Sequence, residues 1–403
     1  MKDRNQLLRQ RLHEVRSRQD PHEQHRTADE EEDNLRPRVH SSLHLRGPQE
    51  EDARTAANRA AVSGMRNPRI SNKKIPQQRV VGMKVASVLD LVMHTEPDIA
   101  RRILDSIGKP KDQLNPPTAD QICKARSAVM QSLGISHQWM GPRRTELYGE
   151  IFEAWVEQAG DPETAVPQWL RDGDPAGIER DPGSVGIFPQ VTEQEAAIYP
   201  SFELNFYNEA HVNYTSMDDS PHGAEVMGDL TGSGYVKKFS NKVDLDNFLK
   251  GAAPVLCRLA LITTEKHGQL KHRLILDCRV SGSNSKAARR ERILLPLAWD
   301  AIRDTLEFLA NAGKDEEIRY VVLDYKDAFY KMPLHEDEYK YFVAEYDGSF
   351  YVWARAAQGS INGPTTYGRL AALTHRMSQA LEDESRFRLQ VFVDDPLGVA
   401  KSK

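Results

Sequence analysis

A chain of 403 residues with a formal net charge of -5 is long enough for two or three domains, and its acidic balance means that any nucleic-acid-binding surface must be local. Its three cysteines, Cys123, Cys257 and Cys278, lie far apart, which argues against a disulfide framework or a CxxC zinc site and favours a reducing, intracellular compartment, cytoplasmic or nuclear. No apolar run approaches the roughly 20 residues needed to span a bilayer, so no membrane partner is expected.

The first segment, residues 1–75, is rich in Arg, Glu, Asp, His and Gln and contains very few large apolar residues. Such a segment cannot bury enough apolar surface to offset the entropy that is lost on ordering it. It is therefore predicted to be a disordered, charged tail. It also lacks the apolar stretch of a secretory signal.

Residues 76–185 predict a mainly helical region that ends in a connector. Val85, Val88, Leu89 and Val92 recur at the spacing of one helix face. The following stretch, GDPETAVPQWLRDGDPAGIERDPGSV, is crowded with Pro, Gly and Asp, which is typical of loops.

Within residues 186–403 the pattern changes to strands. The run RLALITTEKHGQLKHRLILD predicts two strands joined by a turn, and YFVAEYDGSFYVW predicts a hairpin around Asp347-Gly348. A helix is expected to begin at Pro364, since proline suits the first turn of a helix. Together these elements predict an α+β fold, an antiparallel sheet with packed helices.

Two of the predicted strands end in carboxylates. Asp324 ends YVVLD, and Asp394 and Asp395 end QVFVDD. If the strands are neighbours, the carboxylates repel one another, and a divalent cation relieves that repulsion. Two Mg²⁺ (or Mn²⁺) ions about 4 Å apart can serve phosphoryl transfer. Each acidic group taken alone also fits an ordinary turn, as we expect for the second pair, Asp218-Asp219.

The order and spacing of these motifs resemble those of the reverse transcriptases of retroviruses and retroelements, and favour a retrotransposon-type element. The resemblance is carried by YVVLDYKDAFYKMPL, AAQGSINGP, LQVFVDDPLGVA and the hairpin EKHGQLKHRLILDCR, and it covers roughly residues 230–403. It implies an RNA-directed DNA polymerase with its fingers and palm in residues 186–403. The implied partners are an RNA or DNA template with a primer, and deoxynucleoside triphosphates.

The resemblance also assigns roles to single residues. Asp324 and Asp394 would bind both metal ions, Asp395 would complete the carboxylate cluster, and the Tyr325 carbonyl would be a further ligand. The remaining residues would contact the nucleotide: Lys266 and Arg273 at the triphosphate, the backbone N–H groups of Asp327 and Ala328 beside it, Phe329 as the steric gate against a 2′-hydroxyl, and Gln358 and Gly359 beside the incoming base pair.

Three features depart from the family pattern. Phe392 stands where tyrosine is common, Pro396 follows the acidic pair, and the sequence stops at Lys403, before the thumb and RNase H segments of the family. We expect a fingers-and-palm fragment that holds primer–template weakly without a partner segment, so whether it is active or inactive alone stays open. Two alternatives remain open: an inactive retroelement remnant that binds RNA or protein, and an RNA-dependent RNA polymerase, which Phe329 disfavours.

Overall fold

The computed structural model describes residues 75–109, 113–136, 143–193, 195, 201–207, 211–266 and 268–402. The predicted charged tail lies outside these residues, apart from Ile75, where the first described helix begins. Within the described part, no helix is long and apolar enough to cross a membrane.

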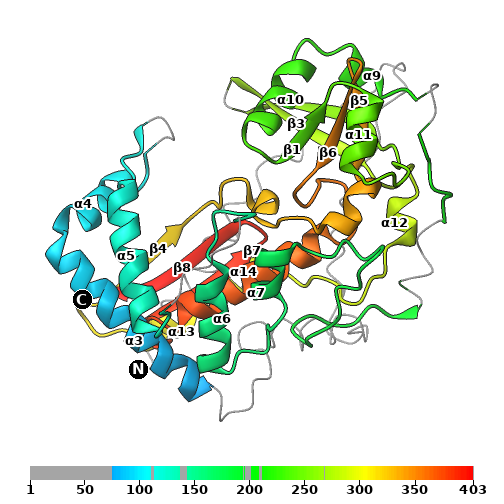
Figure 1. Ribbon diagram of the computed structural model, residues 1–403. Coiled ribbons are helices and arrows are strands. Elements are labelled where there is room, and N and C mark those ends of the chain that lie inside the picture. The colour runs from blue at the N-terminus through cyan, green and yellow to red at the C-terminus, as the bar shows by residue number, and fades with distance from the viewer. Residues whose placement is uncertain are drawn as a thin grey trace, which may run out of the picture. The chain divides into compact units, whose positions relative to one another are not determined.

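Helices make up most of the N-terminal half of the described chain (Figure 1). Their bounds are as follows: α3 (Ile75–Thr95), α4 (Pro97–Ser106), α5 (Ala119–Ser132), α6 (Gly149–Ala159), α7 (Val166–Asp172), α9 (Thr215–Asp218), α10 (Gly223–Gly232), α11 (Lys242–Phe248), α12 (Ser283–Lys286), α13 (Ala298–Ala310), α14 (Gly363–Gln379), and the 3-10 turns η2 (Ala328–Lys331) and η3 (Glu336–Tyr341).

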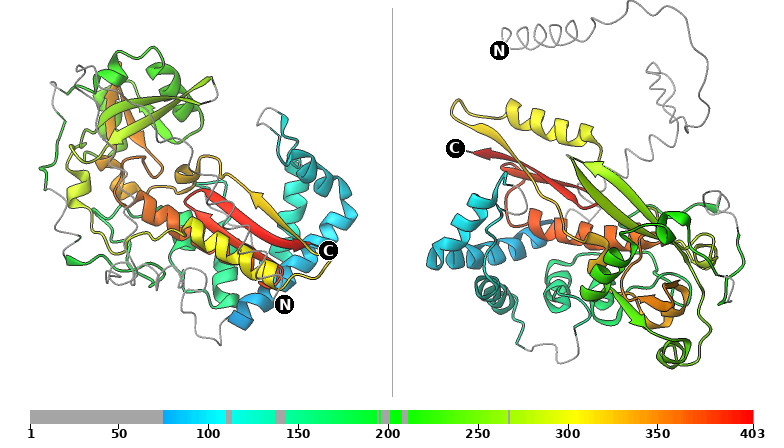
Figure 2. Two further views of the ribbon diagram at one scale, coloured as in Figure 1. Left: turned by 180° about the vertical axis from the view of Figure 1, so that it is seen from behind. Right: turned by 90° about the horizontal axis from the view of Figure 1, so that it is seen from above.

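The strands form small antiparallel sheets, so the mixed α+β class is confirmed. The described strands are β1 (Val236–Phe239), β2 (Arg258–Lys266), β3 (Gln269–Asp277), β4 (Glu317–Val322), β5 (Val343–Tyr346), β6 (Ser349–Trp353), β7 (Phe387–Phe392) and β8 (Asp395–Ser402). Their orders are β1-β6-β5, β2-β3 and β4-β8-β7, and the last sheet is visible from two further sides in Figure 2.

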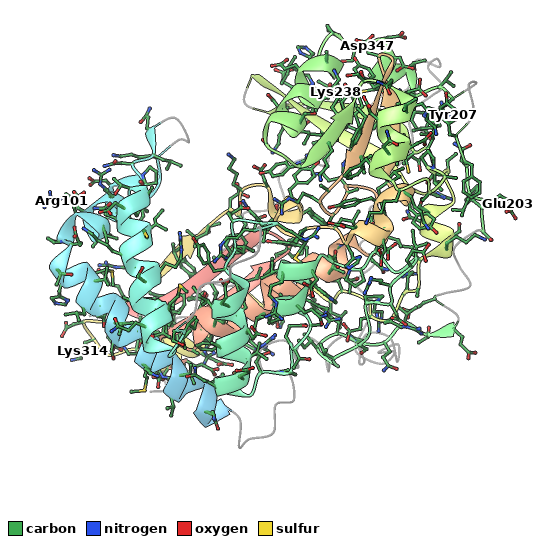
Figure 3. The ribbon with its side chains drawn as sticks, viewed as in Figure 1. Arg101, Glu203, Tyr207, Lys238, Lys314 and Asp347 are labelled. Atoms are coloured by element: carbon green, nitrogen blue, oxygen red, sulfur yellow. The ribbon has the colours of Figure 1, made fainter. Side chains whose placement is uncertain are left out.

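The predicted hairpin around Asp347-Gly348 is confirmed, and it joins β5 to β6. Asp347 has φ 48° and Gly348 has φ 65°, the two positive values that a type I′ turn requires. Asp347 lies at the outer end of this hairpin (Figure 3). The helix expected at Pro364 is α14, which begins one residue earlier.

Two hydrophobic cores hold these elements. The first lies among the sheets β1-β6-β5 and β2-β3, and it buries Leu259 and Trp353. The second combines α3, α6, α7 and α14 with the hairpin β7–β8, and it buries Trp155 and Leu373 with Val391 packed at its edge. Helices of the predicted 76–185 region thus support the strands that carry the acidic pair, while the domain boundary at 185 stays a prediction.

The connector is tied to α14 by ion pairs inside the second core. Arg369 contacts Glu163 at 2.7 Å, with side chains 1% and 0% exposed. Arg376 contacts Asp161 at 2.7 Å, again with both side chains buried. Both guanidinium groups bind both oxygens of their carboxylates, the geometry in which such pairs are strongest. The loop-rich connector therefore fixes the position of α14.

Candidate active site

Three acidic residues lie at one end of the sheet β4-β8-β7. Val322 pairs with Leu397 across β4 and β8. Beyond β4 the Tyr325 N–H still donates to the Asp394 carbonyl at 2.9 Å. The Leu323 N–H donates to the Pro396 carbonyl at 2.9 Å, so the register continues past β4 and sets Asp324 opposite Asp395. The sheet thus brings together the three acidic residues that the sequence singled out.

A tight turn sets the direction of Asp394. Phe392 pairs with Asp395, so Val393 and Asp394 are the two turn residues between β7 and β8. Val393 has φ 57° and Asp394 has no positive φ, which is the pattern of a type II′ turn. A β-branched residue is strained there. Val393 packs against the second core, and this contact holds the strained conformation next to Asp394.

The negative charges of the three carboxylates influence one another. Burial raises the pKa of the Asp394 carboxyl, and the charges of Asp395 and Asp324 raise it further. The positive charge of Lys271 on β3 opposes this rise, so the hairpin β2–β3 reaches toward the acidic group. Two negative neighbours destabilise the charge of a third carboxylate. A cation bound among them relieves this repulsion, which favours its binding.

The three side chains suit a divalent cation such as Mg²⁺ or Mn²⁺, because these ions prefer oxygen ligands and all three side chains are carboxylates. Among the described residues, however, no three His, Cys, Asp or Glu side chains converge closely enough to hold one ion together. Asp324 and Asp395 are exposed. Their side chains therefore have room to turn toward a shared ion.

A group of backbone amides lies just beyond β4. Asp327 has φ 53° and immediately precedes the 3-10 turn η2, and the first N–H groups of such a turn have no acceptor within the turn itself. Successive amides in such a turn form a nest that binds anions. The Tyr235 hydroxyl donates to Asp327 Oδ2 at 3.1 Å, and its ring stacks on Tyr330. Burial, followed by this hydrogen bond, raises the pKa of Tyr235 to about 12.

The Gln358-Gly359 loop is anchored to the end of β3. The Leu276 N–H donates to the Gln358 carbonyl at 3.0 Å. Asn284 Nδ2 donates to the Gly359 carbonyl at 2.9 Å, and Asn284 Oδ1 accepts from the Ile361 N–H at 2.9 Å. Asn284 was not singled out by its sequence, SGSNSK, which reads as an ordinary polar loop. It fixes both sides of the loop, as Tyr235 fixes the nest.

Gly359 is the position in this loop where only glycine fits. Its φ is 126°, and a Cβ there would lie 2.0 Å from the Leu276 carbonyl oxygen. Gly359→Ala is therefore expected to lower the free energy of unfolding by about 2–4 kcal/mol, measured by urea denaturation. Gly228→Ala is the control, since that helical glycine faces open space and its replacement is expected to be neutral or stabilising. Equal stabilities of the two variants would contradict this account of the loop.

The two cations that the sequence assigned to the triphosphate lie on the β2–β3 hairpin. Arg273 is exposed on β3, opposite Ile262. Lys271 is two residues away and therefore shares its side of the strand. Lys266 ends β2 opposite Gln269, and its side chain lies outside the described part of the structure.

Comparisons with known proteins find similarities over part of the chain. No family model matches the chain. Over 148 residues, 36% of this chain, it is 24% identical to the Gag-Pol polyprotein of walleye dermal sarcoma virus, and the match covers 8% of that polyprotein. Over this stretch the chain is therefore similar to a small part of a retroviral Gag-Pol polyprotein.

Solved structures of the foamy viral protease-reverse transcriptase are also similar. A dRH form in complex with double-stranded DNA is 17% identical with a TM-score of 0.29, covering 46% of this chain and 26% of that chain. The native prototype foamy virus protein is 16% identical with a TM-score of 0.31, covering 49% and 22%. A further complex with double-stranded DNA is 18% identical with a TM-score of 0.28, covering 48% and 31%. The chain thus spans less than a third of each of these proteins.

Proposed function

We propose that this chain is the fingers and palm of an RNA-directed DNA polymerase that adds deoxynucleotides to a primer 3′-hydroxyl, with residues 186–403 as the polymerase part. The observation that carries the proposal is the register of β4 and β8, which sets Asp324 beside Asp394 and Asp395. Carboxylates gathered on a rigid sheet are the arrangement that metal-assisted nucleotidyl transfer needs.

Asp324 and Asp394, with Asp395 and the Tyr325 carbonyl beside them, would hold two divalent ions. When bound, such ions activate the attacking hydroxyl and neutralise charge on the leaving group. In the reaction the primer 3′-oxygen forms a bond to the α-phosphorus, and the bond to pyrophosphate breaks. The strand register fixes the backbone positions of the carboxylates, and the exposed side chains of Asp324 and Asp395 would turn toward the ions when these bind.

The nucleotide triphosphate would bind between the amide nest and the fingers hairpin. The N–H groups of Asp327 and Ala328 offer fixed donors, and Arg273 offers a planar fork that can bind two phosphate oxygens. Lys266 would add a point charge. Gln358 and Gly359 would lie beside the nascent base pair, where a backbone without a Cβ permits close approach.

Primer extension on an RNA template with Mg²⁺ or Mn²⁺ tests the proposal. The wild-type chain is expected to extend the primer, and Asp324→Ala is expected to abolish extension. Asp219→Asn is the matched control, because this exposed aspartate of the second acidic pair lies outside the proposed site. Extension that survives in Asp324→Ala as well as in the control would refute the assignment.

The steric gate gives a second test. Phe329→Val is expected to raise ribonucleotide incorporation relative to deoxynucleotide incorporation by about ten- to a hundredfold, because the smaller side chain leaves room for the 2′-hydroxyl. The measurement is the ratio of kcat/KM for the two nucleotides. A wild-type chain that prefers ribonucleotides would instead support an RNA-dependent RNA polymerase.

A further inference from the structure

Tyr367 lies on α14 against the ring of Phe329. Its side chain is 2% exposed. The two ring centroids are 5.3 Å apart, and the planes are inclined by 27° in a stacked arrangement. Stacked aromatic pairs at this distance prefer a defined geometry and are more stable than the burial of their apolar area alone would make them. The ring of Phe329 therefore has a defined aromatic support.

The backbone of α14 completes that support. A Cβ built on Gly363 would lie 3.7 Å and 3.8 Å from Cδ1 and Cε1 of Phe329. Gly363 and Tyr367 are four residues apart and so share one face of the helix. Phe329 itself belongs to η2, a single short 3-10 turn. Its ring thus lies over the helix face formed by Gly363, which leaves it room, and Tyr367, which stacks on it.

The same tyrosine lies near the acidic group. Burial raises the pKa of the Tyr367 phenol, and the neighbouring Tyr325, Asp394, Asp324 and Asp395 raise it further. The contact of Tyr367 with Phe329 is made by its ring. Tyr367 thus contacts Phe329 and lies near enough to the carboxylates to sense their charge.

We infer that Tyr367 is the positioning residue of the sugar gate: its ring holds Phe329 at the angle that excludes a 2′-hydroxyl. The inference rests on the proposed polymerase function, in which Phe329 contacts the sugar. It assigns the effect to the aromatic ring of Tyr367 and not to its hydroxyl. Loss of the ring lets Phe329 tilt over α14, which opens space under the 2′ position of the sugar.

The test compares Tyr367→Leu with Tyr367→Phe. The readout is the ratio of kcat/KM for a deoxynucleotide to that for the matching ribonucleotide in primer extension. We expect Tyr367→Phe to keep the wild-type ratio within about twofold, and Tyr367→Leu to lower it about tenfold. A merely structural loss would lower both incorporations together and leave the ratio unchanged. A wild-type ratio in Tyr367→Leu would overturn the inference.

A second pair of variants leaves Tyr367 intact and decides the question if Tyr367→Leu does not fold. Gly363→Val is expected to push the Phe329 ring off Tyr367 and to lower the ratio, whereas Gly363→Ala adds only a Cβ at ordinary contact distance and is expected to keep it. A wild-type ratio in Gly363→Val would also overturn the inference. If the wild-type chain incorporates neither nucleotide, the proposed function fails, an outcome distinct from incorporation with an unchanged ratio in the variants.

Discussion

Asp394→Asn is expected to remove nucleotide incorporation and to stabilise the ion-free chain at the same time. The amide cannot bind a divalent ion as the carboxylate does, so incorporation is expected to fall by about a thousandfold, the order of effect of removing one charge-stabilising group from an active site. Stability is expected to rise because burial and two negative neighbours disfavour the carboxylate form of Asp394, as the raised pKa of this group indicates, and the amide carries no charge. Such a residue would lower the stability of the fold in return for activity, a common trade-off between stability and function.

The pH dependence follows from the direction of the same pKa shift. Since the folded chain raises the pKa of Asp394, the folded state holds this proton more tightly than the unfolded state. The wild type therefore loses stability as pH rises from about 4, the unfolded value, through the folded pKa. Asp394→Asn should lack this loss, and thermal unfolding between pH 3 and pH 7 measures it.

Mg²⁺ adds a further comparison to that experiment. A ligand that binds only the folded state raises the melting temperature with its concentration. We expect Mg²⁺ to stabilise the wild type and the Asp219→Asn control but not Asp394→Asn. An inactive remnant would show no Mg²⁺ stabilisation that depends on Asp394, and that result would favour the alternative of an RNA- or protein-binding module.

Arg369→Met is expected to have the largest effect on stability. The substitution leaves Glu163, which is fully buried, without its charged partner. It also removes the hydrogen bond to the Pro182 carbonyl and the contact of the guanidinium over the Trp169 ring. Removing one member of a buried pair typically costs about 3–5 kcal/mol, a large fraction of the stability of a domain.

Urea denaturation measures this loss against a matched control, Arg319→Met. Arg319 contacts Glu317 at 3.1 Å, but the two side chains are 67% and 71% exposed. Exposed pairs contribute about 0–1 kcal/mol, so the control is expected to remain near wild type. The double variant Arg369→Met/Glu163→Leu should recover part of the loss, because no isolated charge is left. Equal losses in Arg369→Met and Arg319→Met would show that the buried pair does not hold α14.

Much of the local structure could be predicted from the sequence, because its signals are local. The alternation in QVFVDD and YVVLD predicted strands that end in carboxylates, and Asp347-Gly348 predicted its turn. Whether Asp324 and Asp394 would meet depended on strand order, which alternation does not specify. The family pattern predicted that they lie together, and the register of β4 and β8 sets Asp324 opposite Asp395, the chain neighbour of Asp394.

The supporting residues could not be predicted in the same way. Tyr235 reaches Asp327 across 92 residues, and Arg369 reaches Glu163 across 206. Such contacts depend on how distant elements pack, and the side chains themselves are ordinary for their local sequence. Asn284 and Tyr367 likewise stand in stretches that suggest a polar loop and a helix face. The candidate site residues could thus be recognised from sequence patterns, whereas the residues that support them could not.

The most direct measurement is the incorporation of a single deoxynucleotide onto a primer annealed to RNA, with Mg²⁺ present, by the wild-type chain and Asp394→Asn side by side. We predict extended primer with the wild type and none above background with the variant, while thermal unfolding shows that both chains are folded. Wild-type product no greater than that of folded Asp394→Asn would contradict it.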